Sequence, residues 1–317
     1  MTSIGSILAG AFGLVRRNPL SVIVWGAIYA AAFVLLLVAM RPLFAVYSEL
    51  LSHQLAARTN QPVTPLDLQP YMAQIQTAGS VAFLAEIGVF ALIMVLLSAT
   101  QRAVLRPNER GFAYLRIGGD ELRLIGLGIF LMICLWIGMF LAMLALMIVL
   151  GIVLAISLAI HAAPGFAALL FLVANCALMG AIIYAQVRLS LAFPLTFLRR
   201  TFVVGEAWRL SKGRFWTLFG AYFAIALIYM TLASVLIGFA LAPFFSEVAA
   251  SSNSPEAFRL VLQHQAERFT ALDATNAGLL LGFALLAGFS IALFGGAIAT
   301  AARDLVGDEV GGAATFA

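Results

Sequence analysis

The sequence predicts an all-α polytopic membrane protein with six transmembrane helices arranged as three in-out-in hairpins. Hydrophobic residues make up 63% of the 317-residue chain, charged residues make up only 10%, and the mean hydropathy is +1.06. A soluble core cannot bury that much apolar side chain, so part of it must contact lipid. The apolar residues fall in long runs, and the segments between the runs are polar or contain proline.

Each long apolar run predicts one spanning helix. About 20 apolar residues cross the hydrocarbon core, and backbone polar groups there must pair within the helix. The predicted spans cover residues 19–40, 79–101, 122–158, 165–190, 214–242 and 275–302. We expect them to form a single integral membrane domain over residues 1–317, with the first span serving as an uncleaved signal anchor.

The third run is longer than one span requires. Residues 124–160 contain no charge and no proline, and a helix of that length would reach about 55 Å, against about 30 Å of hydrocarbon. Splitting the run into two spans would move Arg199, Arg200 and Lys212 to the outer side of the membrane. We therefore expect one long helix that is either tilted or broken near Gly151.

The basic residues predict the orientation, because cytoplasmic loops retain Lys and Arg. With the N-terminus inside, every Lys and Arg falls on the cytoplasmic side except Arg41, Arg58, Arg259 and Arg268. Both termini are therefore predicted to be cytoplasmic, in a bacterial inner membrane. The basic residues that give the net charge of +4 lie mostly in these cytoplasmic segments. The charge therefore sets the orientation and does not indicate a nucleic-acid partner.

Similar short segments precede the first, third and fifth spans. They read AFGLVRRNPL from Ala11, AYLRIGGDEL from Ala113 and AWRLSKGRFW from Ala207. Each combines an aromatic residue, basic residues and a helix-breaking turn, which is typical of amphipathic segments in the inner headgroup layer. The predicted interfacial anchors are Phe12, Arg16, Arg17, Tyr114, Arg116, Trp208, Arg209 and Lys212. The pattern also suits a lipid-headgroup site, and as a repeat it predicts three hairpins of one orientation.

The stretch from Gln186 to Phe223 resembles a known family. Its Arg-Leu-Ser exit from the fourth span, its proline and its Trp-Arg-Leu-Ser-Lys-Gly segment are similar to bacterial six-span proteins grouped with the membrane domain of glycerophosphoryl diester phosphodiesterases. Weaker similarity surrounds Phe12 and Phe112. The resemblance implies a fold rather than an activity, and we expect no phosphodiesterase catalytic domain in the chain.

Three polar residues within the spans are candidate binding groups. Glu86 is the only acidic residue inside a predicted span, and an intramembrane carboxylate is a functional candidate. The alternatives are that it pairs with Arg41 or His161, or that the helix starts later and Glu86 lies at the outer interface. Arg188, at the inner end of the fourth span, would bind an anionic headgroup or Glu206, or simply extend to the interface. Asn175 would bond to a neighbouring helix or contact a substrate.

The sequence lacks the patterns of an enzyme or a metal protein. It has no nucleophile, phosphate-binding or zinc-protease motif, and His53, His161 and His264 lack ligand spacing. Cys134 and Cys176 lie in apolar runs, where we expect them to fill small apolar positions. We therefore expect no enzymatic activity, no catalytic residue, no metal and no cofactor.

The last span is rich in small residues: Gly278, Gly282, Gly288, Gly295, Gly296 and Ala299. Such a face predicts close helix packing inside the protein or a homodimer seam. The leading functional hypothesis is a non-enzymatic protein that binds or translocates a lipid or small amphiphile, with membrane lipids as partners. The alternative is a structural, assembly or envelope-stress subunit with a membrane-protein partner.

Overall fold

The structure is a computed structural model that describes residues 2–56, 69–109, 111–159, 164–250, 260–261, 264 and 274–315. These residues form helices and no strand, and six of the helices are long and apolar enough to cross a membrane. The predicted all-α class with six spans is confirmed. The long helices are α2 (Pro19–Ala56), α3 (Gln69–Leu105), α4 (Gly119–Ala159), α5 (Pro164–Leu189), α8 (Phe215–Ala250) and α10 (Ala274–Thr315).

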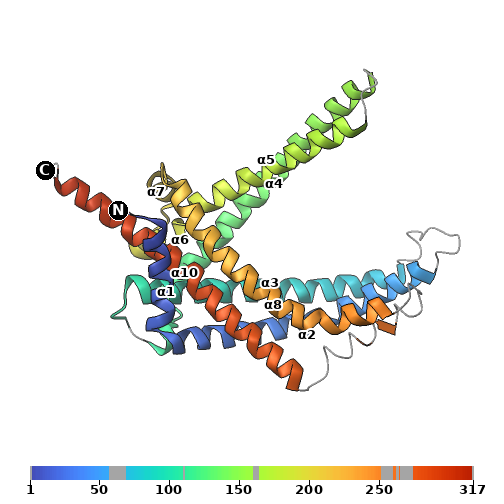
Figure 1. The fold of residues 1–317 in the computed structure, drawn as a ribbon, viewed down its shortest axis with the longest axis horizontal. Helices are drawn as coiled ribbons and strands as arrows, with labels where there is room; N and C mark the ends of the chain where they lie inside the picture. The colour runs from blue at the N-terminus through green and yellow to red at the C-terminus, as the bar shows by residue number, and fades with distance from the viewer. Residues whose placement is uncertain are drawn as a thin grey trace.

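Shorter elements lie where these helices meet. They are α1 (Ile4–Arg17), the 3-10 turn η3 (Phe112–Tyr114), α6 (Ala192–Arg199) and α7 (Val204–Leu210). We call these four elements, together with the residues 106–118 and the helix ends that they join, the base. The start of α1 and Asp308 of α10 also meet there, because the Thr2 hydroxyl donates to the Asp308 carboxylate at 3.3 Å (Figure 1). The starts and ends of the hairpins also meet at the base, as a shared orientation requires.

The long helices diverge from the base in two directions (Figure 1). One arm consists of α4 and α5, and the other consists of α2, α3 and α8, with α10 packed across α2 and α3. Helix α4 is unbroken through Gly151, so one long helix is confirmed and a break there is wrong. Its 41 residues reach about 60 Å, so α4 must tilt strongly if its apolar part is to stay within one bilayer.

Several helices run past the predicted span limits. Helix α2 continues from residue 40 to Ala56 through Pro42, and α10 continues from residue 302 to Thr315. Hydropathy predicts where a helix leaves the hydrocarbon layer, but it does not predict where the helix ends. The helical hydrogen bonds continue as long as the following residues tolerate helical geometry. Pro42 removes one of those bonds without ending the helix.

The protein core surrounds the base and the near halves of the spans. One cluster joins Ile7 and Ala11 of α1 to Leu293 and Ala297 of α10, and another surrounds Trp25 of α2. Helix α1 begins with a capping box between Ser3 and Ser6 and ends at Arg17, with Asn18 as its C-cap, and Pro19 then starts α2. Its apolar face packs on α10 and α8, so that face is not available to the headgroup layer.

Close helix crossings hold α10 in place. A Cβ on Gly288 would lie 3.0 Å from the Gly26 backbone of α2 and closer still to the Val22 carbonyl. Gly295 packs against Thr100 of α3, whereas Gly278 has nothing within 4 Å. The small residues from Gly288 onward therefore serve packing inside the protein, as one of the two alternatives predicted.

Candidate functional site

A buried ion pair joins α3 to α4 at the base. Arg102, in the last turn of α3, donates from Nη2 to Oε1 of Glu121 in the first turn of α4, and Ser98 donates to the same oxygen at 2.7 Å. The Arg102 and Glu121 side chains are only 3% and 2% exposed. A buried pair of this kind is stable only when its remaining polar atoms find partners.

The loop between α3 and α4 supplies one of those partners. Ala113 and Tyr114 have φ angles of 50° and 57°, a left-handed conformation that is uncommon for residues other than glycine. Hydrogen bonds from two buried donors offset the free-energy cost of this backbone conformation. The Trp25 indole donates to the Ala113 carbonyl at 2.8 Å, and Arg102 Nη1 donates to the Tyr114 carbonyl at 2.6 Å.

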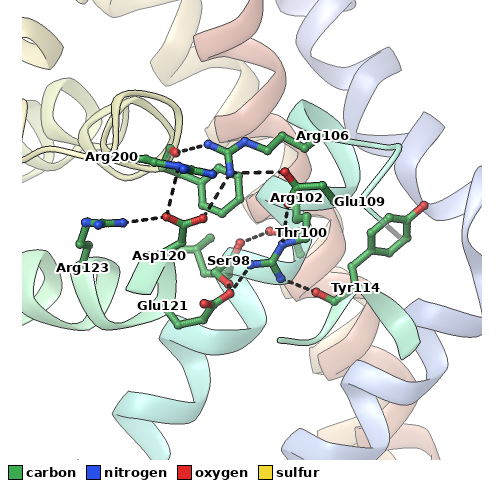
Figure 2. A network of polar contacts seen from close by, with 12 residues as sticks. Ser98, Thr100, Arg102, Arg106, Glu109, Tyr114, Asp120, Glu121, Arg123 and Arg200 are labelled. Atoms are coloured by element: carbon green, nitrogen blue, oxygen red, sulfur yellow. Dashed lines mark hydrogen bonds and ion pairs between the residues drawn. The ribbon is translucent and has the colours of Figure 1, made fainter. Parts of the chain in front are cut away.

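A second set of charges surrounds Asp120, one residue before Glu121 (Figure 2). Its carboxylate lies 3.2 Å from Arg106, 2.8 Å from Arg123 and 3.9 Å from Arg200. Asp120 and Glu121 begin α4, where acidic side chains also favour the positive end of the helix dipole. The Arg106 guanidinium stacks over the Phe197 ring of α6 at 4.6 Å. The network therefore ties α3, α4 and α6 together.

A comparable arginine lies at the end of α5. Arg188 is buried and donates to the Ser211 hydroxyl at 3.0 Å, to the Tyr184 hydroxyl at 2.8 Å and to the Trp208 carbonyl. Its guanidinium also stacks 4.0 Å from the centre of the Trp208 ring. The predicted pairing with Glu206 is wrong, because that carboxylate binds Arg199 at 2.7 Å.

Arg102 and Arg188 play matching roles in two successive hairpins. Each ends the second helix of its hairpin and binds the backbone carbonyl of the aromatic residue, Tyr114 or Trp208, in the segment before the next hairpin. Sequence reasoning missed Arg102, Glu121 and Ser98. A sequence similarity could have identified Arg102. The second and fourth spans each end in a glutamine closely followed by an arginine, Gln101 and Arg102 in one and Gln186 and Arg188 in the other.

The other two candidate binding residues lie apart from the base. Glu86 is an exposed side chain on α3 and has no hydrogen bond or ion pair with the residues that the structure describes. Ala78 and Ala82, on the preceding turns of the same side, are each 5% exposed. Asn175 bonds to the Phe171 carbonyl of its own helix at 2.9 Å, so the predicted bond to a neighbouring helix is wrong.

Most of the predicted interfacial anchors are exposed side chains at the base, as an interfacial role requires. They are Phe12, Arg16, Arg17, Arg116, Trp208, Arg209 and Lys212. Tyr114 differs, because its hydroxyl donates to Asn18 at 3.3 Å and its ring packs on the cluster around Trp25. Tyr114 therefore joins two of the three similar segments to each other.

Chemistry-bearing side chains elsewhere are dispersed. Within the described ranges, no three His, Cys, Asp or Glu residues gather to hold a metal ion. His264 lies 3.6 Å from Glu247, whereas the His53 side chain and His161 fall outside the described residues. Cys134 and Cys176 are free and exposed on the α4–α5 arm rather than packed in a protein core.

Two hollows accompany this arrangement. A pocket of about 450 Å³ lies between α2 and α3, and one of about 390 Å³ lies in the base beside Arg102. The first is lined by Ala39, Pro42, Val46, Ala73, Thr77, Ala78 and Val81. The second is lined by Arg102, Asn108, Glu109, Gly111, Tyr114, Leu115 and Arg116. The first therefore suits a hydrocarbon chain, and the second suits a polar group.

The fold and the base define a polytopic α-helical membrane protein whose hairpins are joined by buried arginines. Comparison of the chain with family profiles, with curated proteins and with solved structures gave no match. The resemblance to the membrane-domain family of glycerophosphoryl diester phosphodiesterases therefore stays a prediction.

The contacts of Arg188 predict a positioning role that lysine cannot fill. Arg188→Lys keeps the charge but loses the planar fork that reaches Ser211, Tyr184 and Trp208 together. We expect a loss of about 1–3 kcal/mol of stability, measured by thermal unfolding in detergent. Arg209→Lys, an exposed neighbour, should leave the melting temperature unchanged. A fully stable Arg188→Lys protein would contradict the packing argument.

Proposed function

We propose that the protein is a non-enzymatic membrane protein that binds or translocates a lipid or small amphiphile between its two arms. The observation that carries this proposal is the lack of burial along the α4–α5 arm. No residue is buried from 129 to 156 or from 169 to 186, and Trp136, Phe140 and Met147 are 62%, 69% and 71% exposed. Such surface is stable only against acyl chains or another apolar partner.

The divergence of the arms supports lipid as that partner. Near the base, Gly128 of α4 packs on Phe90 and Met94 of α3. Farther out, α4 and α5 project away from the other helices (Figure 1). Over the described residues, the two arms pack together near the base and diverge beyond it (Figure 1). Acyl chains can therefore fill the space between them without any protein rearrangement. The apolar pocket between α2 and α3 offers a second surface for such chains.

Glu86 supplies the polar contact in this proposal. An ionisable side chain within an apolar span is costly unless water, a partner or a ligand satisfies it. Glu86 has no such partner among the described residues, and it lies 11 residues into the candidate span Ile75–Leu105. A hydroxyl or amine of a bound amphiphile would satisfy the carboxylate.

A retention experiment tests the role of Glu86. Protein purified in mild detergent should retain lipid that native mass spectrometry detects, and Glu86→Gln should lower its occupancy by about tenfold, the loss expected for a hydrogen bond to a charged group. Asn175→Leu is the control, because the Asn175 amide donates to the Phe171 carbonyl of its own helix and its loss should not affect retention. Equal lipid occupancy in wild type and Glu86→Gln would remove Glu86 from the proposal.

We also propose that the protein lies in a bacterial inner membrane with the base and both termini in the cytoplasm. The support is the concentration of Lys and Arg around the base, together with the contact between Thr2 and Asp308, which brings both ends to one side. Reporter tags on the two ends of the chain in intact cells test the orientation. A periplasmic signal from either end would overturn it.

A structural or assembly role is the second candidate function. The same unburied α4–α5 arm could pack against a membrane-protein partner or a second copy instead of lipid. Purification in mild detergent separates the candidates. A partner at fixed stoichiometry favours assembly, whereas a monomer with bound lipid favours the lipid-binding role.

A further inference from the structure

The pocket of about 390 Å³ in the base is lined by charged and polar side chains that the proposed function does not use. It is lined by residues of the loop between α3 and α4, and Figure 2 shows three of its lining residues, Arg102, Glu109 and Tyr114. Its volume falls within the range of small-molecule sites and exceeds what one buried water needs.

The most buried residue in the lining of this pocket is Arg102. The residue is 2% exposed, and its Nη atoms bind Tyr114 and Glu121. Its Nε has no hydrogen-bond partner among the described residues. A buried N–H without an acceptor costs free energy comparable to a lost hydrogen bond, so this face of Arg102 favours an acceptor in the pocket.

The outer wall carries a second cation. Arg116 is exposed, lines the same pocket and makes no hydrogen bond or ion pair with any residue that the structure describes. Asn108 beside it contributes an amide that can donate. Two guanidinium groups and an amide around one hollow form the donor set that phosphate oxygens prefer.

Glu109 lines the pocket without being bound tightly. Its carboxylate lies 3.8 Å from Arg102 Nε and 3.7 Å from Arg106 Nη1, and its side chain is 41% exposed. Both distances exceed hydrogen-bond length. Glu109 is therefore an internal anion near two arginines, and another anion with better geometry could displace it.

We infer that this pocket binds a phosphate-bearing anion, which takes the position of the Glu109 carboxylate and accepts from Arg102 Nε and Arg116. The inference goes beyond the proposed function, because it stands on the base alone and holds whatever lies between the arms. A phospholipid headgroup and a soluble phosphate ester share this chemistry. The test must therefore include both sources.

The experiment uses the full chain in nanodiscs of phosphatidylcholine. One arm titrates soluble glycerol 3-phosphate by calorimetry, and the other compares lipid capture from nanodiscs with and without phosphatidic acid by native mass spectrometry. Arg116→Gln should weaken phosphate binding by about tenfold, and Glu109→Gln should strengthen it by a similar factor. Both side chains are exposed, so neither change should disturb the fold.

Matched controls distinguish an effect at the pocket from the effect of a change in the protein's overall charge. Arg123→Gln removes a base arginine outside the pocket, and Glu206→Gln removes a base carboxylate outside it, so both should leave binding unchanged. Binding in the soluble arm identifies a free phosphate ester as ligand, and binding only with phosphatidic acid identifies a headgroup. No binding of either probe, or an Arg116→Gln effect equal to that of Arg123→Gln, would overturn the inference. Weaker binding by Glu109→Gln would overturn the displacement step.

Discussion

Replacing Arg102 with methionine is expected to destabilise the protein by about 3–5 kcal/mol, because it leaves the Glu121 carboxylate charged, buried and without its cation. Both side chains are almost fully enclosed, so water cannot compensate. The change also frees the Tyr114 carbonyl, which accepts from Arg102 at 2.6 Å. Thermal unfolding in detergent, followed by tryptophan fluorescence, measures the effect.

A double variant tests whether the pair, and not the arginine alone, carries the cost. Arg102→Met combined with Glu121→Leu removes both charges, and apolar replacement of a buried pair is often neutral. We expect the double variant to unfold at a higher temperature than either single variant. Arg123→Met is the surface control, because Arg123 is 40% exposed and its pair with Asp120 is worth at most about 1 kcal/mol. An Arg102→Met loss no larger than that of Arg123→Met would contradict the prediction.

The pair matters for function because it lies where the two arms join. Arg102 ends α3 and Glu121 begins α4, so their bond fixes one arm to the other. No residue of α4 from 129 to 156 is buried, so that stretch offers no equivalent contact. Loss of the pair should therefore affect the whole α4–α5 arm rather than one side chain.

The sequence predicted the six spans because the length of an apolar run is a local property. The same reasoning recovered α4 as one long helix, since splitting it would have moved Arg199 and Arg200 outside. It could not recover the divergence of the arms. That feature depends on which apolar faces pack together, and faces such as those of Trp136 and Phe140 look the same in sequence whether they meet protein or lipid.

The candidate site residues also show that the sequence does not reveal which distant residues come into contact. Arg188 was recognised as unusual, but its partners Trp208 and Ser211 lie 20 and 23 residues away. Only the fold brings them together. Arg102 was overlooked because the charge-distribution rule already accounted for every arginine near the base. Among the described residues, Arg102 and Arg188 are the buried members of that group, and the rule does not distinguish them from the exposed arginines.

Replacing Gly26 with valine is expected to destabilise the protein by about 3 kcal/mol, because it forces apart the crossing of α2 and α10. A Cβ at Gly26 would lie 3.0 Å from the backbone of Gly288 and closer to the Ala284 carbonyl. Real Cβ atoms essentially never approach other atoms so closely. The obstacle is backbone, which cannot rotate aside as a side chain can, so the two helices must separate.

Separation would spread beyond the glycine. Trp25 of α2 and Ala292 of α10 are both fully buried beside the crossing, and Trp25 also binds the Ala113 carbonyl of the loop. Overpacking in a core costs about 1–3 kcal/mol, occasionally more. We expect the upper end of that range for Gly26→Val and Gly288→Val, and a smaller loss for Gly10→Ala, where the obstacle is only the Thr300 side chain.

Glycines without neighbours supply the control for this prediction. Gly278 of α10 and Gly138 of α4 have nothing within 4 Å of an added Cβ, so alanine at either position should leave the melting temperature unchanged or raise it slightly through better helix propensity. The spacing of Gly278 and Gly282 resembles a helix-packing motif, yet the backbone contact of α10 with α2 lies farther along, at Ala284 and Gly288. Equal melting temperatures for Gly26→Val and Gly278→Ala would mean that α2 and α10 do not cross at this point.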